Sequence, residues 1–224
     1  MEFCSVFIYF ALQSTFKMNI QSDYKKDLSD IREMMEHSSR FISLSGLSGI
    51  FAGIYALAGA WIAYSLIENK YVLYDGKLMG DISFDLVAYL GLDALIVLLL
   101  ALATGIYFTT RKARKKGLRI WDKTTKRLLV NLSIPLVTGG FFCIVLLLRG
   151  VSGLVVPATL IFYGLALLNA SKYTLNDVRY LGLTEIILGL VACFVEGYGL
   201  IVWAIGFGVM HILYGTIMYL KYEK

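Results

Sequence analysis

Glu185 and His211 are the two residues of this sequence whose types and positions could support chemistry in apolar surroundings. Each interrupts a long apolar run, and ionisable side chains within such runs are costly and usually mark functional sites. A histidine beside a carboxylate can exchange a proton near neutral pH. The pair therefore predicts either a site that binds a solute or relays a proton, or a hydrogen-bonded pair that only fixes helix packing.

The apolar runs around these residues are long enough to cross a lipid bilayer. The chain of 224 residues is 58% hydrophobic and 17% charged, whereas soluble domains are about half apolar and a quarter charged. Hydrocarbon offers the backbone no hydrogen-bond partner, so a spanning segment must be a helix of about 20 apolar residues. Six spans are expected, at 41–67, 86–108, 128–148, 151–170, 180–196 and 199–220.

The basic residues predict the orientation of these spans. Eighteen of the 21 Lys and Arg residues lie before the first span, between the second and third, between the fourth and fifth, or after the sixth. Loops rich in Lys and Arg remain in the cytoplasm. The sequence therefore predicts a multi-pass protein of the cytoplasmic membrane with both termini in the cytoplasm.

The remaining segments are short. Residues 1–17 are interpreted as either an over-called start or an interfacial segment, because their apolar run is too short to span a bilayer. Residues 18–40 are expected to form a cytoplasmic amphipathic helix, since their apolar residues follow helical spacing. Residues 41–220 would then be a six-helix transmembrane domain and 221–224 a cytoplasmic tail.

The six spans are predicted to pair as three helical hairpins with a weak parallel repeat. The segment 40–45 resembles 179–184, and Ile161–Gly164 resembles Ile212–Gly215. All hairpins begin on the same side, so the axis of such a repeat would follow the membrane normal. The expected fold class is an all-α integral membrane bundle of six transmembrane helices.

Counting the helix rise from the expected span ends gives the depth of each polar residue. Glu185 lies about 9 Å and His211 about 12 Å from the cytoplasmic face, so the two side chains could meet. Other polar residues fall at similar depths. We therefore predict a candidate ligand pocket in the inner half of the bundle, formed by Glu185, His211, Tyr163, Tyr214, Asn131 and Ser48.

A short motif in the first span resembles the nucleophile motif of the rhomboid intramembrane proteases. Gly46-Leu47-Ser48-Gly49 contains the serine, Tyr55-Ala56-Leu57 follows it, and His211 lies on the sixth span as the histidine of that family does. The resemblance implies a serine nucleophile with a histidine base. The serine lies here on the first span instead of the fourth, however, and the second span lacks the family's histidine and asparagine.

Three functional hypotheses follow from these residues. The first is binding or transport of a small solute or a proton through the inner-half pocket. The second is a non-catalytic membrane scaffold or regulator that binds another protein, and the third is an intramembrane serine hydrolase. No catalytic residue is assigned.

Metal, cofactor and nucleic-acid binding are not indicated. The three cysteines form no CxxC pair, and HExxH and phosphate-loop motifs are absent. The basic stretch between the second and third spans lacks the interleaved aromatic residues of nucleic-acid surfaces. We expect it to contact anionic lipid headgroups, through Arg111, Lys112, Arg114, Lys115 and Lys116.

Overall fold

The computed structural model describes residues 44–70, 73–74, 77–78, 84–115, 117, 120–195 and 197–224. All of them belong to Phe41–Lys224, the second of two units into which the chain divides. The expectations for residues 1–17 and 18–40 therefore lie outside the described residues.

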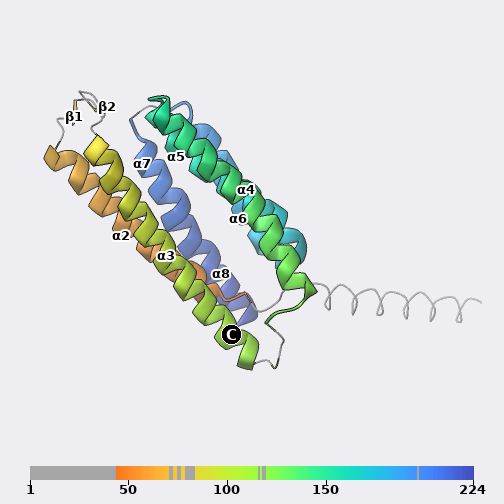
Figure 1. Ribbon diagram of the computed structural model, residues 1–224. Coiled ribbons are helices and arrows are strands. Elements are labelled where there is room, and N and C mark those ends of the chain that lie inside the picture. The colour runs from red at the N-terminus through yellow and green to blue at the C-terminus, as the bar shows by residue number, and fades with distance from the viewer. Residues whose placement is uncertain are drawn as a thin grey trace, which may run out of the picture. The chain divides into compact units, whose positions relative to one another are not determined.

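The described part of the chain is a set of long helices joined by short turns (Figure 1). A hairpin of two short antiparallel strands, β1 (Leu73–Tyr74) and β2 (Lys77–Leu78), lies between the first two helices. The main helices are α2 (Gly46–Lys70), α3 (Phe84–Lys115), α4 (Lys123–Leu148), α5 (Val155–Ala170) and α6 (Asn176–Ala192). The last helix is continuous through α7 (Gly199–Trp203), η3 (Ala204–Met210) and α8 (His211–Tyr222), and short 3₁₀ turns η1 (Ser152–Leu154) and η2 (Ser171–Tyr173) flank α5.

Five helical segments of the described chain are long and apolar enough to cross a membrane. Their outward faces consist largely of leucine, isoleucine, valine and phenylalanine, which is the arrangement expected where lipid replaces water. For the described residues, the prediction of a helical fold whose helices are compatible with a membrane is confirmed at this level, whereas the count of six spans and the hairpin repeat are not. The five segments are Gly46–Glu68, Asp85–Lys115, Lys123–Leu148, Ser152–Tyr173 and Gly199–Tyr222.

Several expected spans have different boundaries in the structure: α2 and α4 begin at 46 and 123 instead of 41 and 128, and α3 and α6 differ as follows. Helix α3 continues to Lys115 instead of ending at 108, so several residues predicted to lie in a basic loop are helical. Basic residues in a last turn favour such an extension, because they interact with the negative end of the helix dipole. Helix α6 covers 176–192 instead of 180–196, and Asp177 in its first turn favours the earlier start.

Helices α5 and α6 form a close pair because glycines remove side chains from their interface. A Cβ atom at Gly164 would lie 2.6 Å from the carbonyl oxygen of Gly182 and 2.9 Å from the backbone nitrogen of Ile186. Small residues allow helix backbones to approach in this way, and van der Waals packing then drives association in lipid. Helix α4 packs on α5.

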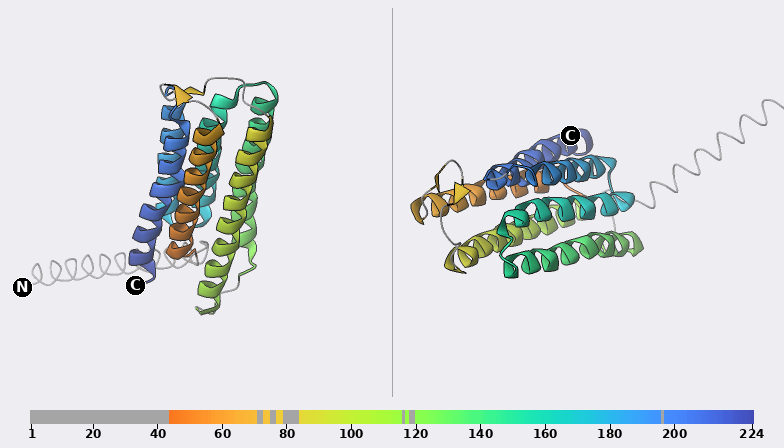
Figure 2. Two further views of the ribbon diagram at one scale, coloured as in Figure 1. Left: turned by 90° about the vertical axis from the view of Figure 1, so that its left-hand side faces the viewer. Right: turned by 90° about the horizontal axis from the view of Figure 1, so that it is seen from above.

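Helices α2 and α8 form a second close pair of the same kind. A Cβ atom at Gly215 would lie 2.8 Å from the carbonyl oxygen of Gly46 and 2.6 Å from the backbone nitrogen of Ile50. Helix α3 packs on the other side of α2. Figure 2 shows these helices running alongside one another with similar axis directions.

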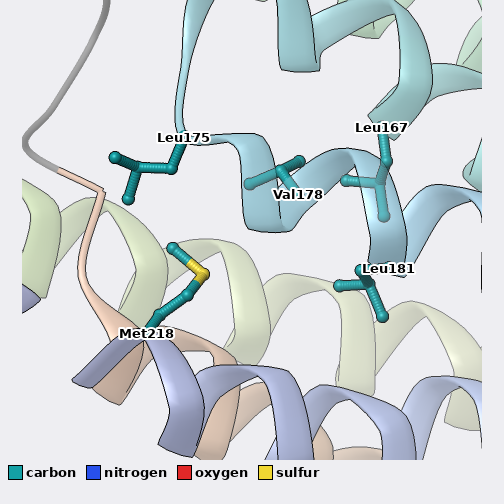
Figure 3. Packing of buried hydrophobic residues seen from close by; sticks show 5 residues of the cluster. All are labelled: Leu167, Leu175, Val178, Leu181 and Met218. Carbon is teal, nitrogen blue, oxygen red and sulfur yellow. The ribbon is translucent and has the colours of Figure 1, made fainter. Parts of the chain in front are cut away.

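A cluster of buried apolar residues connects the first pair to α8. It consists of Leu167 on α5, Val178 and Leu181 on α6, Leu175 just before α6, and Met218 on α8 (Figure 3). Their relative exposures are all 9% or less, so this part of the bundle is sealed by hydrocarbon side chains. It lies at the end of the bundle where α6 begins and α8 ends.

The C-terminal residues, which include the segment 221–224 expected as a tail, contact the bundle. Glu223 accepts hydrogen bonds from the backbone nitrogen of Gly46 at 2.6 Å and from Ser45 Oγ at 3.3 Å. Its Oε1 atom also pairs with Lys112 Nζ at 3.1 Å. The carboxylate thus caps the start of α2, where the helix dipole favours a negative charge.

A second polar contact joins the end of α8 to α6. Lys221 Nζ lies 3.2 Å from Asp177 Oδ2, and the Tyr222 hydroxyl donates to the same oxygen at 2.7 Å. The expected tail is therefore the last turn of α8 followed by a capping residue. Its contacts hold the ends of four helices, α2, α3, α6 and α8, together.

The start of α4 depends on Asp122, which leads to a first testable prediction. The Asp122 Oδ1 atom accepts from the Thr125 backbone nitrogen at 2.7 Å, and this bond holds the pKa of Asp122 below its ordinary value. We expect Asp122→Ala to lower the free energy of unfolding by about 1 kcal/mol, as N-cap removal usually does. Asp122→Asn retains the cap and should cost little.

The pH dependence of Asp122 has a definite sign. A lowered pKa in the folded state means that the ionised form stabilises the fold above the unfolded pKa, and that this contribution is lost as the pH falls through the folded pKa. Thermal unfolding of the purified protein between neutral and acid pH should show this loss in wild type and not in Asp122→Asn. Equal acid sensitivity of both proteins would contradict the prediction.

Candidate functional site

Glu185 lies within the closely packed face of α6. Gly182 and Gly189 are three residues before and four after it, so all three residues lie on one side of the helix. That side packs against α5, and a Cβ atom at Gly189 would lie 3.0 Å from the Ile161 backbone nitrogen. Because Gly182 and Gly189 have no side chains, α5 and α6 approach closely and enclose Glu185 between them. Its relative exposure is 0%.

His211 occupies the point where the last helix returns from π to α geometry. The preceding segment, Ala204–Met210, is a π-helix and contains Gly206 and Gly208. Such wide turns are rare and occur frequently at functional sites. The imidazole of His211 is 6% exposed, and its ring faces the junction between α8, α5 and α6.

The structure brings Glu185 and His211 together. Their closest atoms, His211 Nδ1 and Glu185 Oε1, are 3.5 Å apart. The same nitrogen lies 3.1 Å from the carbonyl oxygen of Gly206, which is the shorter and better placed acceptor. Both carboxylate oxygens of Glu185 are buried and have no hydrogen-bond partner among the described residues.

Tyr163 completes the cluster from α5. Its hydroxyl oxygen is 2.7 Å from His211 Nε2, so this nitrogen is occupied as well. Because the Gly206 carbonyl can only accept, the neutral imidazole would donate from Nδ1 to Gly206 and accept a hydrogen bond from the Tyr163 hydroxyl at Nε2. In that arrangement no hydrogen remains for Glu185. We refer to Glu185, His211 and Tyr163 as the buried polar cluster.

Aromatic rings cover the buried polar cluster on one side. Phe207 stacks on His211, with ring centroids 5.9 Å apart and an interplanar angle of 16°. The ring centroids of Tyr163 and Trp203 each lie 4.9 Å from that of Phe207. These rings exclude water, so electrostatic interactions of the carboxyl group are strong.

Three of the residues predicted for the pocket lie apart from the cluster or at its edge. The Tyr214 hydroxyl is 3.4 Å from Thr184 Oγ1, beside Glu185 in sequence. Asn131 donates to the Arg127 carbonyl of its own helix, α4, at 2.8 Å. Ser48 donates to the Ser45 carbonyl at 2.5 Å. A common depth predicted these residues, but depth does not determine which face of a helix a side chain occupies.

The arrangement does not support a serine–histidine pair. The Ser48 hydroxyl bonds to the backbone of its own segment, whereas both ring nitrogens of His211 have other partners. A nucleophile must lie within hydrogen-bond reach of its base. The resemblance of Gly46–Gly49 to rhomboid proteases is therefore confined to the sequence motif.

Gly206 and Phe207 belong to the site and were not among the predicted residues. A Cβ atom at Gly206 would lie 2.6 Å from Glu185 Oε2 and 2.7 Å from Leu160 Cδ2, so only glycine leaves space for the carboxyl group. The available signal was the Gly-Phe-Gly sequence at 206–208 a short distance before His211. These glycines could not be assigned to the site from the sequence, because their position beside Glu185 depends on the π-helix, which the spacing of apolar residues does not predict.

The basic end of α3 differs from the expected headgroup site. Lys112 points into the protein, where its Nζ atom contacts the Leu44 carbonyl at 2.7 Å as well as Glu223. Its side chain is only 10% exposed. Arg111, Arg114 and Lys115 are exposed, and Lys116 lies outside the described residues.

Comparison of this chain with protein-family models, curated proteins and solved structures finds no match. Its fold and site are therefore interpreted from its own residues.

Tyr163→Phe provides a second testable prediction. The change removes only the hydroxyl group and leaves His211 Nε2 buried without its partner. We expect the free energy of unfolding to fall by about 1–3 kcal/mol, the usual cost of an unsatisfied buried group. Tyr180→Phe, at an exposed tyrosine of α6, is a matched control and should have little effect. Equal melting temperatures for Tyr163→Phe and wild type would contradict the prediction.

Proposed function

We propose that this protein spans the cytoplasmic membrane six times and moves a small solute or a proton across it through the buried polar cluster. The observation that supports this most directly is the Glu185 carboxyl group, which is fully buried and has no hydrogen-bond partner for either oxygen among the described residues. A structural glutamate would be expected to have its oxygens satisfied. Unsatisfied ionisable groups in a membrane helix are typical of ion and solute pathways.

The proposal adds α6, the fifth α-helix of the described residues in chain order, to the five segments that meet the spanning criteria. Its 17 residues rise about 25 Å, slightly less than the hydrocarbon thickness, and the turns at each end supply additional length. It pairs along its length with α5, one of the five segments that meet the spanning criteria. Six spans also keep the Lys and Arg residues predominantly on one side, and five would not.

Two helix pairs share one contact pattern, which supports a parallel repeat. The segment 46–53 (GLSGIFAG) on α2 corresponds to 182–189 (GLTEIILG) on α6. In each pair the first glycine, the isoleucine four residues later and the final glycine contact the partner helix. This alignment differs by three residues from the predicted match of 40–45 with 179–184.

The partner helices follow the same pattern. Ile161 and Gly164 on α5 contact α6, as Ile212 and Gly215 on α8 contact α2. Parallel repeats with an axis along the membrane normal are known in transporters, where substrate sites lie between the repeats. Under this alignment Glu185 corresponds to Gly49 and His211 to Leu160. The polar residues therefore have no counterpart in the other repeat, and they meet where the α5–α6 pair contacts α8.

The proposed orientation can be tested by cysteine labelling. In a cysteine-free background, Arg149→Cys should react with a membrane-impermeant maleimide in intact cells, because it lies between α4 and α5 on the outer side. Lys224→Cys should react only after the membrane is permeabilised. Labelling of both positions in intact cells would contradict the six-span arrangement.

The proposed function is tested by a melting screen of the purified protein across pH, monovalent cations, sugars, amino acids and amines. A ligand or proton that binds the folded state stabilises it. We expect at least one condition to shift the melting temperature of wild type, and Glu185→Gln or His211→Ala to abolish that shift. If both variants melt lower and wild type responds to nothing in the panel, the cluster has a structural role.

The exposed cations of α3 are proposed to contact anionic lipid. Arg111, Arg114 and Lys115 lie at the end of the helix that the orientation above assigns to the cytoplasm. Each basic residue near an anionic surface contributes about 1 kcal/mol to attraction. Lys112 is not included, because its amino group pairs with Glu223.

A further inference from the structure

The space around Glu185 limits the kind of ligand that its carboxyl group can bind. Both oxygens are inaccessible to water, and Gly206 packs beside Oε2, with the side chain of Leu160 on the same glycine. Na⁺ or K⁺ would need several oxygen ligands around it, and the close packing of Gly206 on Glu185 Oε2 leaves little room for such a shell. A proton needs one oxygen and no coordination shell.

His211 lies between two hydrogen-bond acceptors that compete for one hydrogen. Its Nδ1 atom is 3.1 Å from the Gly206 carbonyl oxygen and 3.5 Å from Glu185 Oε1. A charge-assisted bond from nitrogen to a carboxylate has a length of about 2.7–2.9 Å, so a shift of less than 1 Å would transfer the hydrogen bond to Glu185. Tyr163 can remain bonded to Nε2 as the pivot of this movement.

The π-helix supplies a segment in which such a shift can occur. His211 directly follows Ala204–Met210, where the backbone turn is wider than in an α-helix. Gly206 and Gly208 carry no side chains, and their backbone packs directly on neighbouring residues, Gly206 on Glu185 and Gly208 on Leu57. Small displacements of the backbone at Gly206 therefore change the distance from His211 to each acceptor.

Building on the proposed function, we infer that the ligand of Glu185 is a single proton, and that its release transfers the His211 Nδ1 hydrogen bond from Gly206 to Glu185. The carboxylic acid O–H bond breaks, the proton leaves to water, and the two electrons of that bond remain on the carboxylate. His211 keeps its own proton throughout. The carboxylate thereby gains a charge-assisted hydrogen bond, which is about twice as strong as the bond that the neutral acid would accept.

Few other groups can influence this exchange. Tyr163 faces Glu185 from α5 and His211 faces it from α8, while the Tyr214 hydroxyl bonds to the neighbouring Thr184. The segments α7 and η3, which also pack on α6, contain no titratable side chain. The exchange is therefore a property of the buried polar cluster alone.

Infrared difference spectroscopy tests the first half of the inference. The full-length protein in lipid nanodiscs is titrated with pH, and the carbonyl stretch of a protonated carboxylic acid is followed. We expect a band that disappears with rising pH, shifts on ¹³C-glutamate labelling of wild type, and is absent from Glu185→Gln. It should remain in Asp93→Asn, a matched change at a carboxyl group within the spanning helix α3, and should be unaffected by exchanging Na⁺ for K⁺.

Nitrogen NMR of the imidazole tests the second half. In a His37→Gln background His211 is the one remaining histidine, since the chain has two. Its ¹⁵N resonances should change at the pH at which the infrared band disappears, and should stay constant there in Glu185→Gln. A glutamate band that does not titrate, or that responds to Na⁺, overturns proton binding; a titrating band without any change at His211 overturns the transfer.

The inference and the proposed function can fail separately. Solute or proton flux without titration of Glu185 would reject the proton as its ligand and leave transport intact. Titration of both residues in a protein that supports no flux would reject transport and leave the proton site intact.

Discussion

Gly215→Ala is expected to lower the free energy of unfolding by about 3 kcal/mol, the upper end of the usual cost of overpacking. The added methyl group would lie 2.6 Å from the Ile50 backbone nitrogen and 2.8 Å from the Gly46 carbonyl oxygen. Backbone atoms within a helix cannot move individually, so α8 must move away from α2. Gly164→Ala should have the same effect on the pairing of α5 with α6, for the same geometric reason.

Gly140→Ala on α4 is the matched control. No heavy atom lies within 4 Å of a Cβ atom built at this position. Alanine is the better helix former, so this change should raise stability by about 0.5–1 kcal/mol. Unfolding in mixed micelles, followed by circular dichroism, compares the three variants. If Gly215→Ala and Gly140→Ala had equal free energies of unfolding, α2 and α8 would not be in backbone contact.

Glu185→Met is expected to raise the free energy of unfolding by about 1–4 kcal/mol while removing any response to protons or ligands. Methionine has a similar volume and no polar atoms that need partners, and apolar replacements of buried ionic groups are often stabilising by this amount. The carboxyl oxygens of Glu185 lose no hydrogen bond in this change, because they have no partner in the structure. A residue that reduces stability and is needed for activity is typical of a functional site.

A decrease in the free energy of unfolding of Glu185→Met would identify a structural role for Glu185. If Glu185 and His211 form a charged pair that holds the helices together, removal of one partner should cost about 3–5 kcal/mol. The free energies of unfolding of wild type, Glu185→Met and Glu185→Gln distinguish the two cases. Gln introduces an amide whose donors also lack partners, so it should be less stable than Met in either case.

The sequence was sufficient to predict the spanning helices because apolar runs of this length have few alternatives. Glu185 and His211 were predicted at similar depth from the helix rise, and the structure has them 3.5 Å apart. Asn131 shows the limit of that reasoning, because a residue at the correct depth can lie on the wrong face of its helix. The ligand-binding role of these residues remains a prediction.

Other features required the three-dimensional arrangement. In the sequence, Gly206 is one of many small residues in an apolar helix. Its role became evident only from the structure, where it lies beside Glu185 Oε2. Lys112 resembled its basic neighbours, and its pairing with Glu223 joins residues far apart in sequence. The start of α6 at Asn176 lies in a polar first turn that contains Asp177, and a search for apolar segments passes over such a turn.

The central claim, that Glu185 is the site of transport, is tested most directly by proton flux. Wild type, Glu185→Gln and Asp93→Asn are incorporated at equal density into vesicles containing a pH-sensitive dye, and an external pH step is applied with valinomycin and K⁺ to prevent charge build-up. We predict that wild type and Asp93→Asn acidify the vesicle interior at least tenfold faster than Glu185→Gln. Equal rates for wild type and Glu185→Gln, above the rate of protein-free vesicles, would contradict a role of Glu185 in proton transport.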